Sequence, residues 1–341
     1  MDVDAQTMAR LEARSVQLAR HLKPCPLCGR TEHDVVGTRD RDGRDLRTVM
    51  CQACGHVFTN PAPNEDDLKT YYTEHYRSTY KGVLTPKRKH VLRAGYRALE
   101  RLSRLRGFLT PPAKVLDVGA GGGEFAYLLS CTGYDVVGVE PNAGYASFAS
   151  QSYGLDIRAT TLELIDFPAA TFDAITMHHV LEHIADPSAA LKRLACWLKP
   201  GGLMVVEVPN VMSWFHAPRR RFHDAHLHTF NHAGLEDIFT ATGFKVESLY
   251  ITPGTAHLNI VAREQTSPTE SPSCRNATSD VAAHFKRHTE IAHVVSGMAF
   301  KRIWGNAVRP WRERQMLVSL GNPTVARDIL DRLFAAKSTA A

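Results

Sequence analysis

The sequence predicts an α/β protein built on a parallel, doubly wound sheet, and two observations carry that prediction. Short β-branched runs alternate with segments of helical character through the middle third of the chain. The first of these runs, Lys114 to Val118, leads directly into a cluster of glycines, at the edge of the sheet where such proteins bind ligands. With 341 residues, 44% of them apolar and 22% charged, the chain is long enough for about two folded units.

The N-terminal end carries no sign of a membrane span or a secretory signal. No apolar run reaches the roughly 18 residues that a bilayer crossing needs. Short apolar residues within the first 22 are interrupted by Arg10, Glu12, Arg14 and Arg20. We therefore expect residues 1–22 to form a helix, and the protein to be cytoplasmic with cysteines that are thiols or metal ligands.

Charge is distributed unevenly along the chain. Residues 1–112 hold 20 Lys/Arg against 13 Asp/Glu, residues 113–279 hold 11 against 17, and residues 280–341 hold 10 against 5. Basic flanks therefore surround an acidic middle. Such flanks occur in proteins that bind nucleic acid or an anionic substrate, and equally as solvated faces.

Four of the seven cysteines form two pairs with the spacing of a zinc ribbon. The pairs are Cys25 with Cys28 and Cys51 with Cys54, and a glycine follows each of them. A glycine at that point lets the chain turn so that backbone amides face the thiolates. Between the pairs, residues 34–38 and 47–50 read as short strands around an Asp-Arg-Asp-Gly turn. We predict a zinc ribbon over residues 23–60, with a structural Zn²⁺ because four thiolates leave no open position.

Residues 61–112 combine a tyrosine-rich stretch with a basic amphipathic helix. The helix is predicted from Lys87 to Phe108, where apolar residues fall on one stripe and lysines and arginines occupy the rest. Pro111 and Pro112 end it.

The middle of the chain, residues 113–265, supplies the alternating elements of the sheet. Strands are predicted at 114–118, 135–140, 172–177, 203–209, 245–251 and 258–262, and helices at 124–131, 187–198 and 231–242. The last two strands are expected to pair as a hairpin. Thr266 to Ser279 reads as an exposed linker, and helical patterns follow at 281–303 and 324–334.

The glycine cluster points to a nucleoside cofactor. Gly119, Gly121 and Gly123 follow the first strand, but the position where a dinucleotide fingerprint needs its third glycine holds Glu124. Such spacing lets the chain pass flat against a nucleoside without a pyrophosphate. Glu140 closes the second strand, where a carboxylate can accept both hydroxyls of an adenosine ribose.

These residues resemble the first motif of the class I S-adenosylmethionine-dependent methyltransferases, which have a Rossmann-like fold. The likeness continues through residues 172–187 and 198–210 and covers about residues 113–262. It implies that S-adenosylmethionine is bound, with Asp117 near its methionine amino group and residues 161–163 near adenine. The implied cofactor-binding residues are Asp117, Gly119, Ala120, Gly121, Gly123, Glu140, Pro141, Thr161, Leu162, Glu163 and His178.

Histidines follow the fourth strand, where such a cofactor would direct its methyl group. If a helix begins near His179, then His179, Glu182 and His183 share one face. A neutral imidazole can accept a hydroxyl proton, so His179 is the first candidate for a general base, with His183 and His228 as fallbacks. The stretch is also similar to quinone O-methyltransferases, whose corresponding segment lines the active site and can hold a divalent metal. The alternative is a purely structural role.

A second histidine group lies in the loop after the fifth strand. His226, His228 and Phe230 alternate, so an extended segment would place them on one side, and Asn231 can cap the next helix. Three arginines at 219–221 could bind a phosphate or simply be solvated. His228 is therefore a further candidate base, or a packed side chain.

A narrower resemblance joins the two halves of the chain. A Cys-x-x-Cys pair, a tyrosine-rich segment and this core look like bacterial methyltransferases that modify nucleotide sugars, glycans and secondary metabolites. That likeness implies a lid carrying Tyr72, Tyr76 and Tyr80, with Tyr76 among the catalytic candidates. The sugar C-methyltransferases have a further α/β domain that residues 266–341 do not supply.

The sequence therefore favours O-methylation of a sugar, glycan or small metabolite, and the arginines at 219–221 would suit a phosphorylated substrate. C-methylation of a nucleotide sugar and methylation of RNA are the alternative activities, and a non-catalytic adaptor is a third class. The ribbon is nearly balanced in charge and lacks interleaved basic and aromatic residues, which argues against nucleic acid as a partner.

Overall fold

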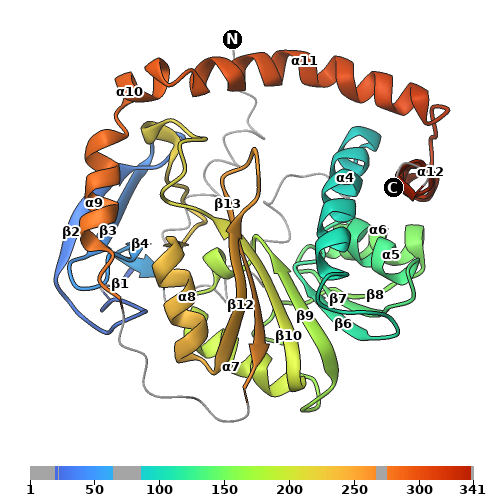
Figure 1. Cartoon of the computed structure of the whole chain (residues 1–341), viewed down its shortest axis with the longest axis horizontal. Helices are drawn as coiled ribbons and strands as arrows, with labels where there is room; N and C mark the ends of the chain where they lie inside the picture. Colours follow the sequence, from blue (N-terminus) through green and yellow to red (C-terminus); the bar gives the residue numbers. More distant parts are fainter. Residues whose placement is uncertain (1–19, 22, 64–85, 266–274, 339–341) are drawn as a thin grey trace, which may run out of the picture.

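A computed structural model describes residues 20–21, 23–63, 86–265 and 275–338 (Figure 1). Its centre is a seven-stranded sheet in the order β12-β13-β10-β9-β6-β7-β8. These strands are β6 (Lys114–Val118), β7 (Asp135–Val139), β8 (Asp156–Arg158), β9 (Phe172–His178), β10 (Leu198–Pro209), β12 (Phe244–Ile251) and β13 (His257–Glu264). The five strands from β10 to β8 are parallel, whereas β13 pairs antiparallel with both β10 and β12. The predicted sheet and its closing hairpin are thus confirmed.

Helices cover both faces of this sheet. They are α4 (Arg88–Leu105), α5 (Glu124–Ser130), α6 (Ala143–Tyr153), α7 (Pro187–Trp197) and α8 (His232–Ala241), with short 3₁₀ turns η2 (Leu181–His183) and η3 (Pro218–Arg220). Successive side chains of a strand point to opposite faces, so Leu116 packs with α7 and α8 while Val115 packs with α4 and α5. The sheet is therefore packed between two apolar layers. Because five of its strands are parallel, their carboxyl ends lie together at one edge.

Helix α6 and the edge strand β8 were not predicted. Asn142 caps α6 by accepting a hydrogen bond from the backbone N–H of Tyr145 at 3.0 Å. The helix is rich in Ala, Ser and Gly, and it buries mainly Ala146, Ala149 and Tyr153. Its weak apolar periodicity gives no clear helical signal.

The cysteine-rich segment forms a second sheet. Its strands are β2 (His33–Arg39), β3 (Asp45–Cys51), β4 (Val57–Thr59) and β11 (His228–Thr229), in the order β11-β4-β3-β2. The two predicted strands are confirmed as β2 and β3. However, β11 comes from the loop between β10 and α8 and pairs with β4, so this sheet is shared with the larger part of the protein.

The prediction of a helix over residues 1–22 is wrong at its C-terminal end. Arg20–His21 forms strand β1, which pairs antiparallel with β5 (Ala62–Pro63). Residues 1–19 lie outside the described residues.

The C-terminal segment forms four helices: α9 (Thr278–Arg287), α10 (Glu290–Val295), α11 (Met298–Ser319) and α12 (Ala326–Ser338). The predicted linker is too long, because Arg275 donates to Asp237 and Ala277 is buried against the ribbon. Figure 1 shows α11 running along one edge of the molecule and α12 returning beside α4. Ile329 and Leu330 of α12 are fully buried against the α4 and α5 layer, so this helix belongs to the core.

Among the described residues, no helix is both long and apolar enough to cross a membrane.

Candidate active site

The glycine turn after β6 leaves a gap in the protein surface. Gly119, Gly121 and Gly123 have φ of +74°, +57° and +82°, the left-handed region that favours glycine. A Cβ on Gly119 would lie 2.3 Å from Val180, whereas a Cβ on Gly121 would meet no protein atom within 4 Å. The space in front of Gly121 is therefore open to a ligand that passes close to the backbone.

Glu140 connects this turn to the end of β7. One carboxylate oxygen accepts the N–H of Gly121 and the other accepts the N–H of Asn142, each at 2.8 Å. Burial raises the pKa of Glu140 in spite of these hydrogen bonds. Each oxygen retains lone pairs, so the carboxylate can still accept hydroxyl groups of a ribose.

Asp117, Thr176 and His178 meet at the ends of β6 and β9. The Thr176 hydroxyl donates to Asp117 at 2.8 Å, and His178 Nδ1 lies 3.8 Å from the same Asp117 oxygen. Burial lowers the pKa of His178 to about 4, so this imidazole is neutral at physiological pH. Its ring meets the ring of Phe125 edge to face, with the centroids 5.0 Å apart.

The residues predicted near adenine lie in the turn after β8. Thr161 and Leu162 are buried, and Glu163 is exposed. Arg193 of α7 fixes this turn by donating to the carbonyl oxygens of Leu162 and Glu163 at 3.0 and 3.3 Å. Since β8 pairs with β7, the turn lies on the same side of the sheet as Glu140. The binding roles of all these residues, Ala120 and Pro141 included, stay predictions.

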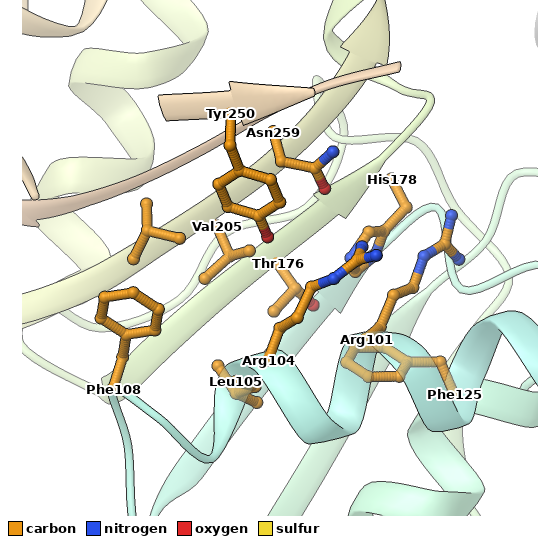
Figure 2. Close-up of a pocket in the computed structure, with 11 residues that line it drawn as sticks. Arg101, Arg104, Leu105, Phe108, Phe125, Thr176, His178, Val205, Tyr250 and Asn259 are labelled. Atoms are coloured by element: carbon orange, nitrogen blue, oxygen red, sulfur yellow. The ribbon is translucent and has the colours of Figure 1, made fainter. Parts of the chain in front are cut away.

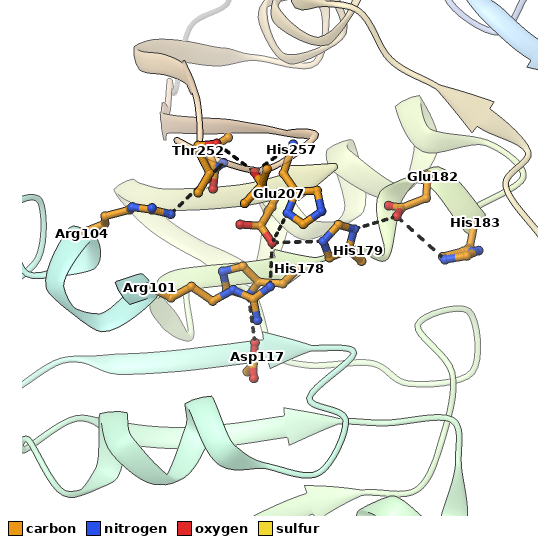
Figure 3. Close-up of polar contacts among 12 residues, drawn as sticks. Arg101, Arg104, Asp117, His178, His179, Glu182, His183, Glu207, Thr252 and His257 are labelled. Carbon is orange, nitrogen blue, oxygen red and sulfur yellow. Dashed lines mark hydrogen bonds and ion pairs between the residues drawn. The ribbon is translucent and has the colours of Figure 1, made fainter. Parts of the chain in front are cut away.

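His179 lies between two carboxylates. Its Nδ1 is 3.3 Å from Glu182 Oε1, and its Nε2 is 3.1 Å from Glu207 Oε1 (Figure 3). Burial opposes a charge on the ring, but these two hydrogen bonds outweigh it and raise the pKa of His179 to about 9. His179 is thus a charged donor at both nitrogens and has no free lone pair to accept a proton.

The prediction of a helix that begins near His179 is wrong. His179 has φ of +61°, and its N–H donates to the Glu207 carbonyl at 2.8 Å. Only the 3₁₀ turn η2 follows. His179 and Glu182 are brought together by this turn and not by a helix face.

Glu207, at the end of β10, was missed by the sequence analysis and is the centre of the polar network. The same oxygen that faces His179 accepts Arg101 Nη2 of α4 at 2.7 Å and lies 3.5 Å from His257 Nδ1. The carboxylate is 4% exposed, and although burial opposes its charge, the hydrogen bond from His179 and the charge of Arg101 lower its pKa. A single acid in the apolar run 203–209 was the available signal.

His183 differs from His179 because only one of its ring nitrogens makes a hydrogen bond. Its Nδ1 donates to the carbonyl oxygen of Ala225 at 2.7 Å, which leaves Nε2 as the acceptor nitrogen, 3.9 Å from Glu182 Oε1. The ring meets His226 edge to face with centroids 4.9 Å apart. Burial and the nearby His183 lower the pKa of His226 to about 3.

His228 is not grouped with these residues. It is 4% exposed in β11, and its Nδ1 lies 3.2 Å from His56 Nε2 of the cysteine-rich segment. His228 and Phe230 share one side as expected, because both pack against His56. The expectation is wrong for His226, which packs against His183 and His223. Tyr72, Tyr76 and Tyr80 lie outside the described residues.

The three arginines of the same loop have separate surroundings. Arg221 is stacked on Phe285 at 4.4 Å and donates to His288, while Arg219 and Arg220 are exposed. The backbone N–H of Arg219 donates to Glu290 of α10.

Two groups in this region have ligand atoms close enough for a metal ion. They are His179 with Glu207 and His257, and Glu182 with His183 and His226. In the first group the guanidinium of Arg101 already occupies the shared Glu207 oxygen, which disfavours a second cation there. In the second group Glu182 Oε2 is buried and has no hydrogen-bond partner.

A small cavity lies between α4 and the sheet, beside the polar network (Figure 2). Apolar and aromatic groups make up most of its wall, and Arg101, Arg104, Asn259 and His178 supply polar atoms. The lining residues are Arg101, Arg104, Leu105, Phe108, Phe125, Thr176, His178, Val205, Tyr250, Asn259 and Val261. The free space is enough for about one water molecule, so the wall would have to move to admit a larger ligand.

The four predicted zinc ligands lie together. Cys25 Sγ is 3.6 Å from Cys54 Sγ, Cys28 Sγ is 3.5 Å from Cys51 Sγ, and all four sulfur atoms lie within 4.8 Å of one another. Tetrahedral thiolates about 2.3 Å from a zinc ion would be roughly 3.8 Å apart. The cluster therefore fits the ion with small adjustments.

The charge on His179 should make stability depend on pH. The folded pKa of about 9 exceeds the ordinary 6.5, so the stabilisation is complete below pH 6.5 and is lost as pH rises through 9. Despite burial, the hydrogen bond from His179 lowers the pKa of Glu182 from 4.5 to about 2, so its contribution is complete above pH 4.5. We expect the His179–Glu182 pair to stabilise the folded protein most between pH 4.5 and 6.5. Above pH 9 the free energy of unfolding should be lower by an amount on the order of 3 kcal/mol. Thermal unfolding against pH should show this fall in wild type but not in His179→Gln; an equal fall in both would contradict it.

Comparisons with known proteins cover the central part of the chain. A family model described as "Methyltransferase domain" matches residues 88–249, from α4 into β12. The ubiquinone biosynthesis O-methyltransferase of Bradyrhizobium diazoefficiens is 39% identical over 142 residues, which are 38% of this chain and 55% of that protein. The protein of the same name from Parvibaculum lavamentivorans is 40% identical over 102 residues, 28% of this chain and 40% of that protein. The chain thus spans about half or less of the length of these curated relatives.

Two solved structures of low sequence identity match part of the chain. An S-adenosylmethionine-dependent methyltransferase from Mesorhizobium loti is 16% identical with a TM-score of 0.41, covering 48% of this chain and 96% of that one. A methyltransferase from Aquifex aeolicus is 18% identical with a TM-score of 0.41, covering 49% and 88%.

Proposed function

We propose that the chain is a class I S-adenosylmethionine-dependent O-methyltransferase acting on a hydroxyl group of a small molecule, because residues 88–249 match a family model described as "Methyltransferase domain". The observation that carries the proposal is the position of the polar network around Glu207. It lies at the ends of β9 and β10, next to Asp117 and the open glycine turn on β6. A cofactor site and a set of proton-binding groups therefore share one edge of the sheet.

The residues of the glycine turn fit the cofactor. Gly121 offers open space, Glu140 offers lone pairs to the ribose, and Asp117 offers a carboxylate to the methionine amino group. When bound, S-adenosylmethionine supplies a methyl group on a positively charged sulfur.

The chain's own part in the chemistry is to hold the acceptor and take its proton. We assign the proton-accepting role to His183 Nε2, since the hydrogen bond from Nδ1 to Ala225 fixes the tautomer that leaves Nε2 free. His179 remains charged between its carboxylates and orients Glu207 and Glu182. This proposal moves the role from His179, the first candidate in the sequence, to its neighbour.

The acceptor we propose is an aromatic hydroxyl. Phe108, Phe125 and Tyr250 line the small cavity beside the network, so an aromatic ring that widened it would meet aromatic walls, and Arg104 could balance the negative charge of a phenolate. The curated relatives carry the name ubiquinone biosynthesis O-methyltransferase, which supports an O-linked acceptor. Arg104 would also suit an acceptor that carries an acidic group.

A sugar or glycan hydroxyl is the second candidate acceptor. The cysteine cluster favours it, because this feature carries the likeness to sugar and secondary-metabolite methyltransferases. We further propose that the cluster holds one structural Zn²⁺.

Glu140→Ala should weaken cofactor binding. Loss of a charged hydrogen-bond acceptor costs about 1.5–3 kcal/mol, or roughly 10- to 150-fold in Kd. Titration calorimetry with S-adenosylmethionine on wild type and variant measures it, and Glu100→Ala, at an exposed position of α4, is the matched control. Equal affinity in wild type and Glu140→Ala would overturn the cofactor assignment.

Methyl transfer to a catechol and to a panel of sugars, measured with the wild-type protein, decides between the two acceptor classes.

A further inference from the structure

The outward face of α11 is apolar and aromatic. Phe300 is 71% exposed, Trp304 is 60% exposed, Trp311 is 64% exposed and Val318 is 56% exposed. These residues are separated by four, seven and seven positions, so they form one stripe along a helix of 22 residues. The stripe faces solvent along its whole length.

The inward face of α11 is polar. Arg302 donates to His216 at 3.0 Å, and Glu313, 6% exposed, pairs with Arg93 of α4. Near the C-terminal end Leu317 packs against the apolar layer of the core. A surface helix of a globular protein normally turns its apolar stripe inward, so the orientation of α11 is reversed.

Helix α10 extends the same apolar surface. Ile291, Val294 and Val295 are 78%, 64% and 80% exposed. Ile303 on α11 is 68% exposed. The two helices follow one another along one edge of the molecule in Figure 1. Contiguous exposed apolar surface of this kind marks an interaction site.

The charges beside the apolar stripe are positive. Lys301, Arg312 and Arg314 are exposed and border it. From residue 290 to residue 319 the chain has five Lys/Arg against two Asp/Glu, and Glu313 is already paired with Arg93. Two copies meeting through this surface would bring like charges together, whereas an anionic surface would complement them.

We propose that α10 and α11 lie in the interface of an anionic lipid bilayer, and that the surface binds membranes. Tryptophan rings favour the headgroup region because they combine an apolar body with an N–H donor, and flanking lysines and arginines reach lipid phosphates. A basic amphipathic helix with Trp and Phe on its apolar face is the usual form of such an anchor. Trp304 and Trp311 are the central contacts, and the polar contacts of Arg302 and Glu313 hold the helix on the protein.

The test is flotation of the full-length protein with lipid vesicles. Wild type should float with phosphatidylcholine vesicles that contain about 30% phosphatidylglycerol, float much less with phosphatidylcholine alone, and dissociate as salt rises from about 0.05 to 0.5 M. Trp304→Ser with Trp311→Ser should lower partitioning by at least about tenfold, and Arg312→Glu with Arg314→Glu by a similar factor. All four side chains are exposed, so the fold should survive, and the thermal unfolding midpoint checks it.

Control variants make an apolar-to-serine change and a double charge reversal elsewhere on the surface. Val35→Ser changes an apolar side chain that is 51% exposed on β2, and Lys192→Glu with Lys245→Glu reverses two exposed charges on α7 and β12. Both should bind vesicles like wild type. Wild type that does not float with anionic vesicles, or a tryptophan variant that floats equally well, overturns the proposal. A concentration-dependent dimer that the tryptophan variant abolishes, without vesicle binding, would assign the surface to self-association and also overturn it.

Discussion

Replacing Cys51 by serine is expected to remove zinc and to unfold the ribbon together with part of the methyltransferase domain. Cys51 is fully buried, and a metal bound by four thiolates contributes about 10–16 kcal/mol to folding. The effect should extend beyond the ribbon, because β4 pairs with β11 from the loop between β10 and α8. Elemental analysis should find about one zinc per chain in wild type and none in the variant.

Hydrogen exchange locates the damage. Amides of Val57–Thr59 and His228–Thr229 should lose protection in Cys51→Ser, while those of β6 keep most of theirs. Cys196→Ser, at an exposed cysteine of α7, is the matched control and should retain both zinc and protection. A Cys51→Ser protein that keeps its zinc, or keeps β11 protected, would refute the coupling.

His183→Ala is expected to lower kcat by about 10² to 10⁴ while the affinity for S-adenosylmethionine stays near wild type. The loss follows from removing Nε2, the imidazole nitrogen that the contact with Ala225 leaves free for a proton. Single-turnover methyl transfer from labelled cofactor measures the chemical step separately from binding. His232→Ala, at an exposed histidine that begins α8, is the control.

The pH profile distinguishes His183 from His179. If His179 were the proton acceptor, the rate would rise with pH up to about 9, because its hydrogen bonds to Glu182 and Glu207 raise its pKa to about that value. A positioning role for His179 predicts instead that activity declines as pH rises through 9 and the imidazolium is lost. A fully active His183→Ala protein with a rate that climbs to pH 9 would return the role to His179.

Much of the sheet could be predicted because its strands carry strong local signals. Lys114–Val118 matches β6 to the residue, since an apolar β-branched run is bounded by proline and alanine on one side and glycine on the other. The strands β2 and β3 were equally clear, because they lie between the two cysteine pairs on either side of an Asp-Arg-Asp-Gly turn. Helix α6 was missed because small residues carry its buried face, and residues 304–319 of α11 were missed because the apolar stripe of this helix does not face the core.

The site was predicted only where its residues are close in sequence. His179 and Glu182 were identified from their spacing, although a 3₁₀ turn and not a helix joins them. Glu207, His257 and Arg101 come from β10, β13 and α4, and the sheet order is what brings them together. A single sequence gives the elements but not which distant ends meet, so these three residues could not have been assigned to the site.

The burial of α12 limits how the protein can be shortened. A gene fragment that ends after β13, near residue 265, would look like a complete catalytic unit by sequence. Without α12, however, the side chains of α4 and α5 that pack on Ile329, Leu330 and Leu333 would be exposed to water, at roughly 1.5–3 kcal/mol for each large apolar group. Such a fragment should be recovered mainly as aggregate, and fusion partners or affinity tags at the C-terminus need a spacer so that α12 can still pack against α4 and α5.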